Sequence, residues 1–313
     1  MKRLAYFLGA ALIVAGSASC DKDPVDFPIV GTFTFTGTYN TYSHGTQGWT
    51  ADDQLGIFVT SDGVAQSNLL YTPAEYSKLE ESEYVPGYFV YGDPVLTTTF
   101  KAASEQAGFK QGEHMVYAYV PYSADNKDFT AIKLQDNGSQ EYSSTSFSPD
   151  QKYNFAYAKL ASPVTEYTAE AISFGDFVTP FTQITVPSPK FADKELLKGG
   201  ESIDKVVITS TVDIAIADGT INLETGDITG TRSKSIEISF ANEKATVEYS
   251  AWLGASLPTF YIIAATDFAT ANDAEYTISV TIDGKEYTAT GKPFTQWGIT
   301  EGNVNLYNAF TIE

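Results

Sequence analysis

The residues that could do chemistry are few and scattered along the chain. Its two histidines, His44 and His114, are far apart, and His114 begins an apolar stretch. Zinc sites normally draw on several Cys or His ligands, so we expect structural or surface roles for both. The many serines form no GxSxG motif, which marks one class of hydrolase. The sequence therefore predicts no metal, no cofactor and no enzymatic activity.

A pair of carboxylates, Asp52 and Asp53, adjoins Trp49 in the stretch GWTADDQLGIF. Two carboxylates beside an aromatic side chain suggest a glycosidase, but glycosidases place their carboxylates on opposite sides of the scissile bond. Adjacent residues of a strand point to opposite faces instead. The pattern therefore favours a turn before a buried strand at Leu55–Val59.

Tryptophan could also serve in binding, as a flat platform for sugars. The chain has three, Trp49, Trp252 and Trp297. Each adjoins a strand pattern, which favours packing in a core or at the end of a sheet.

The single cysteine, Cys20, follows a segment with the layout of a secretory signal. Lys2 and Arg3 precede the uncharged apolar run Leu4–Gly16, and the small residues Ser17–Ser19 follow it. This run is short for a transmembrane helix, which needs about 20 residues. A cysteine at this place resembles that of a bacterial lipobox, whose sulfur receives a diacylglyceryl group. We expect Cys20 to be lipidated, with acyl chains such as palmitate as the anchor; an ordinary secretory signal with an incidental cysteine is the alternative.

Acidic residues dominate the chain after the cysteine. Asp21 and Asp23 resemble the acidic surface-export signal of Bacteroidetes lipoproteins, which predicts an outer-membrane, cell-surface location. The whole chain carries a formal net charge of −20. Such a charge repels phosphate backbones and disfavours nucleic-acid binding. It also disfavours adhesion to anionic lipid, so attachment to a membrane must come from the acyl anchor.

Strand patterns dominate the rest of the sequence. The stretch TFTFTGTY places Phe33 and Phe35 on one face of an alternating strand, while QLGIFVTS and HMVYAYVPY are continuous apolar runs typical of strands buried on both faces. Asp283-Gly284 between alternating runs predicts a hairpin, and SFANEKATVEY predicts a second one that turns near Asn242 and Glu243. Further strands are expected in YNFAYAKL, FTQITVPSP, DKVVITSTV, SIEISF and TFYIIAAT, a glycine-turned strand pair in DGTINLETGDITGT, and short helices in PAEYSKLEESEY and FADKELLKGG.

Many short strands with frequent turns predict an all-β protein built from β-sandwiches. The prolines at 187 and 189, followed by the predicted helix FADKELLKGG, mark a domain boundary. The expected organisation is a signal peptide at 1–19, a lipidated tether at 20–26, and β-sandwich domains at 27–187 and 188–313.

Several ordered motifs resemble those of the fimbrillin family, the subunits of type V pili in Bacteroidales. The family's W…GD.IGVF stretch is similar to GWTADDQLGIFVTSDG, and NLLYT follows as it does in the family. MVYAYVPYS is similar to the YYAYYPY strand, and KYNFAYAKL with ISFGDFVTPFTQITV to the DFLYA…V.L.F segment. FTQWGITEGNVNLYNAFTIE is similar to the closing W..G..Y.Y.I.L strand. The set covers most of the chain, from Trp49 to Glu313.

This resemblance implies two tandem transthyretin-like β-sandwich domains after a lipoprotein signal peptide. It also implies a structural component of a cell-surface fimbrium, a pilus subunit or anchor, that assembles by strand exchange with other fimbrial subunits and acts in adhesion to a host or bacterial surface ligand. A surface lipoprotein that binds polysaccharide beside an outer-membrane transporter is the alternative. An esterase or glycosidase ranks far below both.

The closing stretch NVNLYNAFTIE alternates, with Val304, Leu306, Asn308, Phe310 and Ile312 on one face of an extended strand. Such a strand either completes its own domain or is donated to a neighbour. The resemblance favours donation, with Val304, Leu306, Phe310 and Ile312 as the side chains that fill the neighbour's pockets.

Stalk subunits of the fimbrillin family are thought to lose their first strand to an arginine- or lysine-specific protease, which opens the groove for the donor. This chain has no Lys or Arg from Asp23 to Ser77. We therefore expect the strand with Phe33 and Phe35 to be retained under such a protease. Either the chain is an anchor or terminating subunit, or a protease of another specificity matures it.

Overall fold

The computed structural model is all-β, and every element in its described residues is a strand. Those residues are 29–31, 33–39, 49, 51–61, 64–65, 68–74, 97–103, 109–110, 112–142, 155–166, 168, 170–184, 200–240, 245–246, 249–250, 254–255, 260–263, 273–292 and 304–305. The helices expected in PAEYSKLEESEY and FADKELLKGG lie almost wholly outside these residues.

The largest sheet has eight strands, all from the first 177 residues, in the order β11-β8-β3-β5-β6-β2-β12, with β4 paired to β3. Its strands are β2 (Phe35–Tyr39), β3 (Leu55–Ser61), β4 (Val64–Ala65), β5 (Leu69–Pro73), β6 (Thr97–Ala102), β8 (Met115–Val120), β11 (Ala156–Lys159) and β12 (Ile172–Phe177). All pairs are antiparallel except β2 with β12.

A six-stranded sheet forms most of the second half, in the order β10-β17-β14-β22-β23, with β18 paired to β14. Its strands are β10 (Ser139–Tyr142), β14 (Ser202–Ser210), β17 (Ser235–Phe240), β18 (Ala245–Thr246), β22 (Tyr276–Ile282) and β23 (Lys285–Gly291). The edge strand β10 comes from the first half of the chain and pairs with β17 in parallel.

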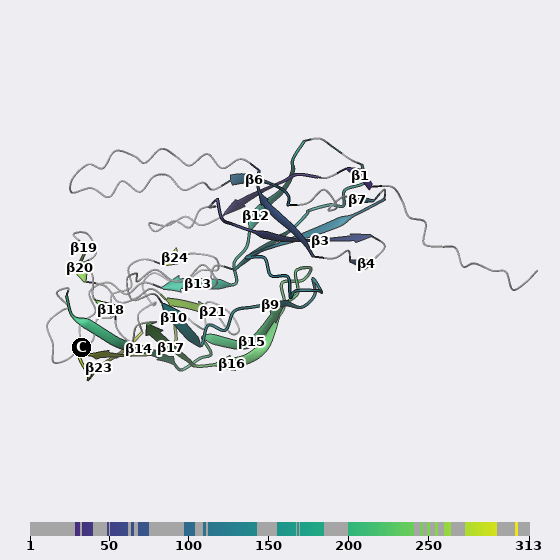
Figure 1. Cartoon of the computed structure of the whole chain (residues 1–313). Helices are drawn as coiled ribbons and strands as arrows, with labels where there is room; N and C mark the ends of the chain where they lie inside the picture. Colours follow the sequence, from purple (N-terminus) through teal and green to yellow (C-terminus); the bar gives the residue numbers. More distant parts are fainter. Residues whose placement is uncertain are drawn as a thin grey trace, which may run out of the picture.

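Two three-stranded sheets also combine strands from both halves. One has the order β16-β15-β9 and the other β21-β13-β24. Their strands are β9 (Ile132–Lys133), β13 (Phe181–Ile184), β15 (Ala215–Ile221), β16 (Ile228–Ser233), β21 (Phe260–Ile263) and β24 (Val304–Asn305). Two further pairs are β1 (Ile29–Gly31) with β7 (Phe109–Lys110), and β19 (Tyr249–Ser250) with β20 (Gly254–Ala255). Figure 1 shows β9, β10 and β13 lying among the strands of the second half. The domain boundary at residue 187 stays a prediction, and four strand pairings, made by β9, β10 and β13, cross it.

The Asp283-Gly284 hairpin is confirmed, because β22 and β23 pair from Ile282↔Lys285 onward. Asp283 and Gly284 have φ of 49° and 75°, the two left-handed residues of a type I′ turn. The strand pair in DGTINLETGDITGT is confirmed as β15 and β16. The second hairpin was expected between β17 and β18, and that expectation is wrong. β18 pairs with β14 at Ser202 and Ile203, beyond the part of β14 that β17 occupies.

Two hydrophobic cores lie on opposite faces of the eight-stranded sheet. The first core holds Leu55, Ile57 and Val59 of β3, together with Phe33 and Phe35. The second core holds Phe58 of β3 with Tyr117 and Tyr119 of β8, and it continues into the strands of the second half. The expectation that QLGIFVTS and HMVYAYVPY are buried on both faces is therefore confirmed.

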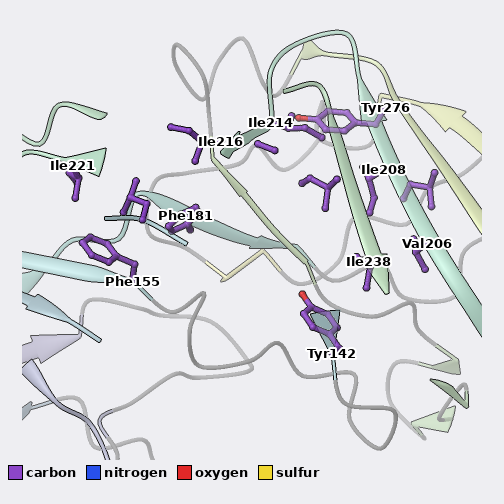
Figure 2. Close-up of a cluster of buried hydrophobic side chains, with 14 of the residues drawn as sticks. Tyr142, Phe155, Phe181, Val206, Ile208, Ile214, Ile216, Ile221, Ile238 and Tyr276 are labelled. Atoms are coloured by element: carbon purple, nitrogen blue, oxygen red, sulfur yellow. The ribbon is translucent and has the colours of Figure 1, made fainter. Parts of the chain in front are cut away.

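The second core joins the two halves of the chain. Figure 2 shows Phe155 and Tyr142 of the first half in one cluster with residues of β14, β15, β17 and β22. Tyr117 stacks on Phe129, with ring centroids 4.6 Å apart, and the Phe129 carbonyl accepts the Leu223 N–H at 2.9 Å. Apolar burial of this kind is the dominant stabilising term in folding, so the two halves stabilise each other.

Candidate strand-exchange site

Strand β2 lies inside its sheet, next to the edge strand β12, although it comes near the start of the chain. On one side it pairs antiparallel with β6, from Phe35↔Phe100 to Thr38↔Thr97. On the other side it pairs in parallel with β12, from Ile172↔Phe35 to Phe177↔Tyr39, with a register shift between Ser173 and Asp176. Its two neighbours thus come from sequence positions about 60 and 140 residues later. One early strand therefore holds two later strands together by backbone pairing.

The side chains of this segment alternate as the sequence predicts. Phe33 and Phe35 are buried, with 3% and 0% of their surface exposed, whereas the intervening threonines are partly exposed. The Phe35 ring lies 4.9 Å from that of Phe174 and 5.6 Å from that of Tyr71. Burying two Phe side chains contributes about 3–6 kcal/mol, so the segment from Phe33 through β2 is a substantial part of the first core.

The slot between β6 and β12 holds β2. Gly37 is the third inward position, and the slot leaves no room there for a side chain. A Cβ at this position would lie 2.6 Å from a ring carbon of Phe177 and 3.3 Å from one of Trp49. The Trp49 indole N–H donates to the Gly37 carbonyl at 2.9 Å. At its three inward positions, the slot between β6 and β12 therefore accepts an aromatic ring at the places of Phe33 and Phe35 and no side chain at the place of Gly37.

Two aromatic contacts fix the Gly37 end of the slot. Trp49 meets Phe100 of β6 edge-on at 4.8 Å and Phe177 of β12 edge-on at 5.1 Å, and it is 1% exposed. Trp49 thus connects the two strands that flank β2. The prediction of a core role for Trp49 is confirmed, and its ring is not available as a sugar platform.

The other candidate residues have structural surroundings or lie outside the described residues. His114 is 2% exposed, and its backbone exchanges two hydrogen bonds of 2.8 Å with Val164. Asp52 lies in the expected turn before β3. His44, Trp252 and Trp297 lie outside the described residues.

The residues expected to mediate attachment and donation are mostly outside the described part too. Val304 begins β24, which pairs in parallel with β13 of the same chain at Gln183 and Ile184. Cys20, Leu306, Phe310 and Ile312 are not described. Lipidation of Cys20 and donation of the C-terminal strand stay predictions.

Sequence reasoning missed the two strands that flank β2 and the part that Gly37 and Trp49 play between them. The signal for Gly37 was present, because a glycine in the middle of an alternating strand indicates a close approach of another group. No local pattern indicated that β12 would pair with a strand so far back in the sequence.

Within the described residues, no group of three or more His, Cys, Asp and Glu side chains could hold a metal ion. In that same part of the chain, no helix is long and apolar enough to cross a membrane.

No protein-family model and no curated protein matches this sequence. Among solved structures, a proposed cell adhesion protein from Bacteroides uniformis aligns at 16% identity and a TM-score of 0.48, covering 88% of this chain and 90% of its own. A proposed cell adhesion protein from Bacteroides fragilis aligns at 11% identity and a TM-score of 0.40, covering 89% of each chain. A fimbrial assembly protein from Parabacteroides distasonis aligns at 11% identity and a TM-score of 0.39, covering 87% of this chain and 88% of its own. At these identities and TM-scores the alignments carry no functional argument.

Proposed function

We propose that this chain is a non-enzymatic structural component of a cell-surface fimbrium, a pilus subunit or anchor, that assembles with other fimbrial subunits by β-strand addition and acts in adhesion. The observation that carries the proposal is the position of β2. An early strand lies between two later strands, β6 and β12, and its Phe35 packs in the first core beside Phe33, which lies just before the strand. In β-strand addition, backbone hydrogen bonds give affinity and pockets for alternate side chains give specificity.

The slot has the features that such an exchange needs. Without β2, the facing edges of β6 and β12 would present unpaired backbone groups, and an unpaired edge is a template for another strand. The pockets left by Phe33 and Phe35 would then receive apolar side chains of the incoming strand.

The slot is nevertheless fitted to the chain's own β2. Its third inward position admits only a glycine, since a Cβ at Gly37 would meet the Phe177 ring at 2.6 Å. The C-terminal stretch from Val304 to Glu313 contains no glycine, so the tail of a second copy would force the Phe177 ring to move. Together with the absence of Lys and Arg from Asp23 to Ser77, this supports a subunit that keeps its first strand, as an anchor or terminating subunit does.

The signal-like segment before Cys20 supports attachment of this subunit to the outer membrane by a lipid. With a formal net charge of −20, the chain is repelled by anionic lipid surfaces, so the acyl chains must supply the membrane affinity. The polysaccharide-binding alternative loses one of its three candidate platforms, because Trp49 is buried.

The proposal is tested by negative-stain microscopy of cells with and without this protein, together with a Cys20→Ser variant. We expect fimbriae to be lost or detached without the protein, and the Cys20→Ser protein to leave the membrane fraction and take up no fatty-acid probe. Unchanged fimbriae would contradict the fimbrial role. A Cys20→Ser protein that is still acylated and membrane-bound would contradict the anchor alone.

A further inference from the structure

The chain contains one Asn-Gly dipeptide, Asn137-Gly138, in the segment between β9 and β10. In a flexible chain the backbone nitrogen after an asparagine attacks the side-chain amide carbon, and glycine favours the attack because it has no Cβ. The new N–C bond closes a cyclic imide, while the C–N bond of the amide breaks and ammonia leaves with the proton of the attacking nitrogen. Water then opens the imide to aspartate or isoaspartate.

The fold holds the amide of Asn137 in place. The residue is fully buried, with 0% of its surface exposed. Its Oδ1 accepts the Ile216 N–H at 2.8 Å, and its Nδ2 donates to the Ile214 carbonyl at 3.3 Å. The side chain thus replaces a strand partner of β15, and its amide carbon is not free to turn toward the next backbone nitrogen.

The attacking nitrogen is held as well. The Gly138 N–H donates to Oδ1 of Asp136 at 2.8 Å, and the Gly138 carbonyl accepts the Glu237 N–H of β17 at 2.8 Å. The dipeptide is therefore fixed to β15 on one side and to β17 on the other.

A buried series of hydrogen bonds also depends on Asn137. Nε2 of Gln140 donates to the Asn137 carbonyl at 2.8 Å, and the Tyr142 hydroxyl donates to Oε1 of Gln140 at 2.8 Å. Gln140 is fully buried and Tyr142 is 1% exposed. A carboxylate at position 137 could not donate to the Ile214 carbonyl, and it would place a charge in a fully buried site.

We propose that Asn137 is a latent deamidation site. The folded chain protects it, and it reacts when the segment that carries β10 detaches from β15 and β17. Deamidation then opposes reattachment, because the product no longer fits the buried site. The modification is thus a one-way chemical record that this segment has opened.

The test incubates the full-length protein at mildly alkaline pH, folded and in a urea concentration that unfolds it. Peptide mapping by mass spectrometry follows the exchange of NH2 for OH at residue 137. We expect the folded protein to react about a hundredfold more slowly, which corresponds to an opening free energy of about 2.8 kcal/mol at 1.4 kcal/mol per tenfold. Equal rates in the two states would overturn the proposal.

Gly138→Ala is the matched control. A Cβ at this position would meet only the end of the Asp136 side chain at 3.2 Å, with other atoms at 3.7 Å, so the variant should fold. We expect it to react far more slowly than the parent in urea. The one-way step is tested by removing urea from deamidated parent protein and measuring its denaturation midpoint. We expect this midpoint to be lower than that of the undeamidated protein. An unchanged midpoint would overturn that step.

Discussion

At the scale of single residues, Gly56 decides how the second core is built. It lies in β3 opposite Tyr119 of β8, and the Tyr119 ring crosses it so closely that a Cβ would meet ring carbons at 2.0 and 2.3 Å. The ring cannot easily move, because the Tyr119 hydroxyl donates to the Ser123 carbonyl at 3.0 Å and accepts from Nδ2 of Asn68 at 2.8 Å. These bonds also fix the loop that leads from β8 toward the second half.

We therefore expect Gly56→Ala to lower the free energy of unfolding by about 1–3 kcal/mol, the usual cost of overpacking a core. Chemical denaturation with circular dichroism measures it. Gly138→Ala, whose added methyl has room, serves as the matched control and should change the midpoint little. If Gly56→Ala changes the midpoint as little as Gly138→Ala does, the Tyr119 ring moves aside without a free-energy cost.

Two buried tyrosines make the protein sensitive to alkaline pH. Burial raises the pKa of Tyr71 in β5 and of Tyr276 in β22 far above the ordinary value. Above a pH of about 10 the unfolded chain loses these two protons while the folded chain keeps them. The unfolded state then binds fewer protons, so stability falls as pH rises from about 10 toward the folded-state pKa values.

Denaturation midpoints measured across this range should therefore fall with pH, and Tyr71→Phe should fall less steeply than the parent. Among the described residues nothing pairs with the Tyr71 hydroxyl, so Tyr71→Phe should also keep or raise stability at neutral pH. A parent midpoint that stays level above a pH of about 10 would contradict the buried, protonated state of both residues.

At the scale of elements, the strands that follow a local pattern could be predicted, and those that pair over long distances could not. The apolar runs in β3 and β8 indicated burial on both faces, and Asp283-Gly284 indicated its hairpin. β10 gave no such signal, because its polar residues Gln140 and Glu141 suggest a loop, and its partner β17 lies almost a hundred residues later. Burial of Asn137 and Gln140 is possible only because other elements supply their hydrogen-bond partners, which a local pattern cannot contain.

If the chain assembles as proposed, the C-terminal strand is the element donated to the neighbouring subunit. Deleting Val304–Glu313 should block formation of filaments or ladders in mild detergent while leaving a folded monomer. Loss of β24 removes only the pairing of Val304 and Asn305 with β13 from the described sheets. Circular dichroism and size-exclusion chromatography check the monomer. If the truncated protein unfolds outright, the strand belongs to its own core.

At the scale of the whole molecule, the two halves depend on each other. β9, β10 and β13 of the first half pair with strands of the second, and Phe58, Tyr117 and Tyr119 pack into the second core. A fragment of residues 188–313 would lack all of these, and we expect it to show no cooperative unfolding transition. Thermal unfolding followed by circular dichroism tests this. A sharp transition in the fragment would establish the second half as an independent domain.

We propose that this chain is built into a surface fimbrium with its first strand in place. The most direct measurement is intact mass and N-terminal sequencing of the protein recovered from purified cell-surface fimbriae. We expect the chain to be present there and its mature start to lie before Phe33, with a lipidated Cys20 as the first residue. Absence of the chain from fimbriae would contradict the fimbrial role, and a mature start between Gly37 and Gln54 would contradict the retained strand.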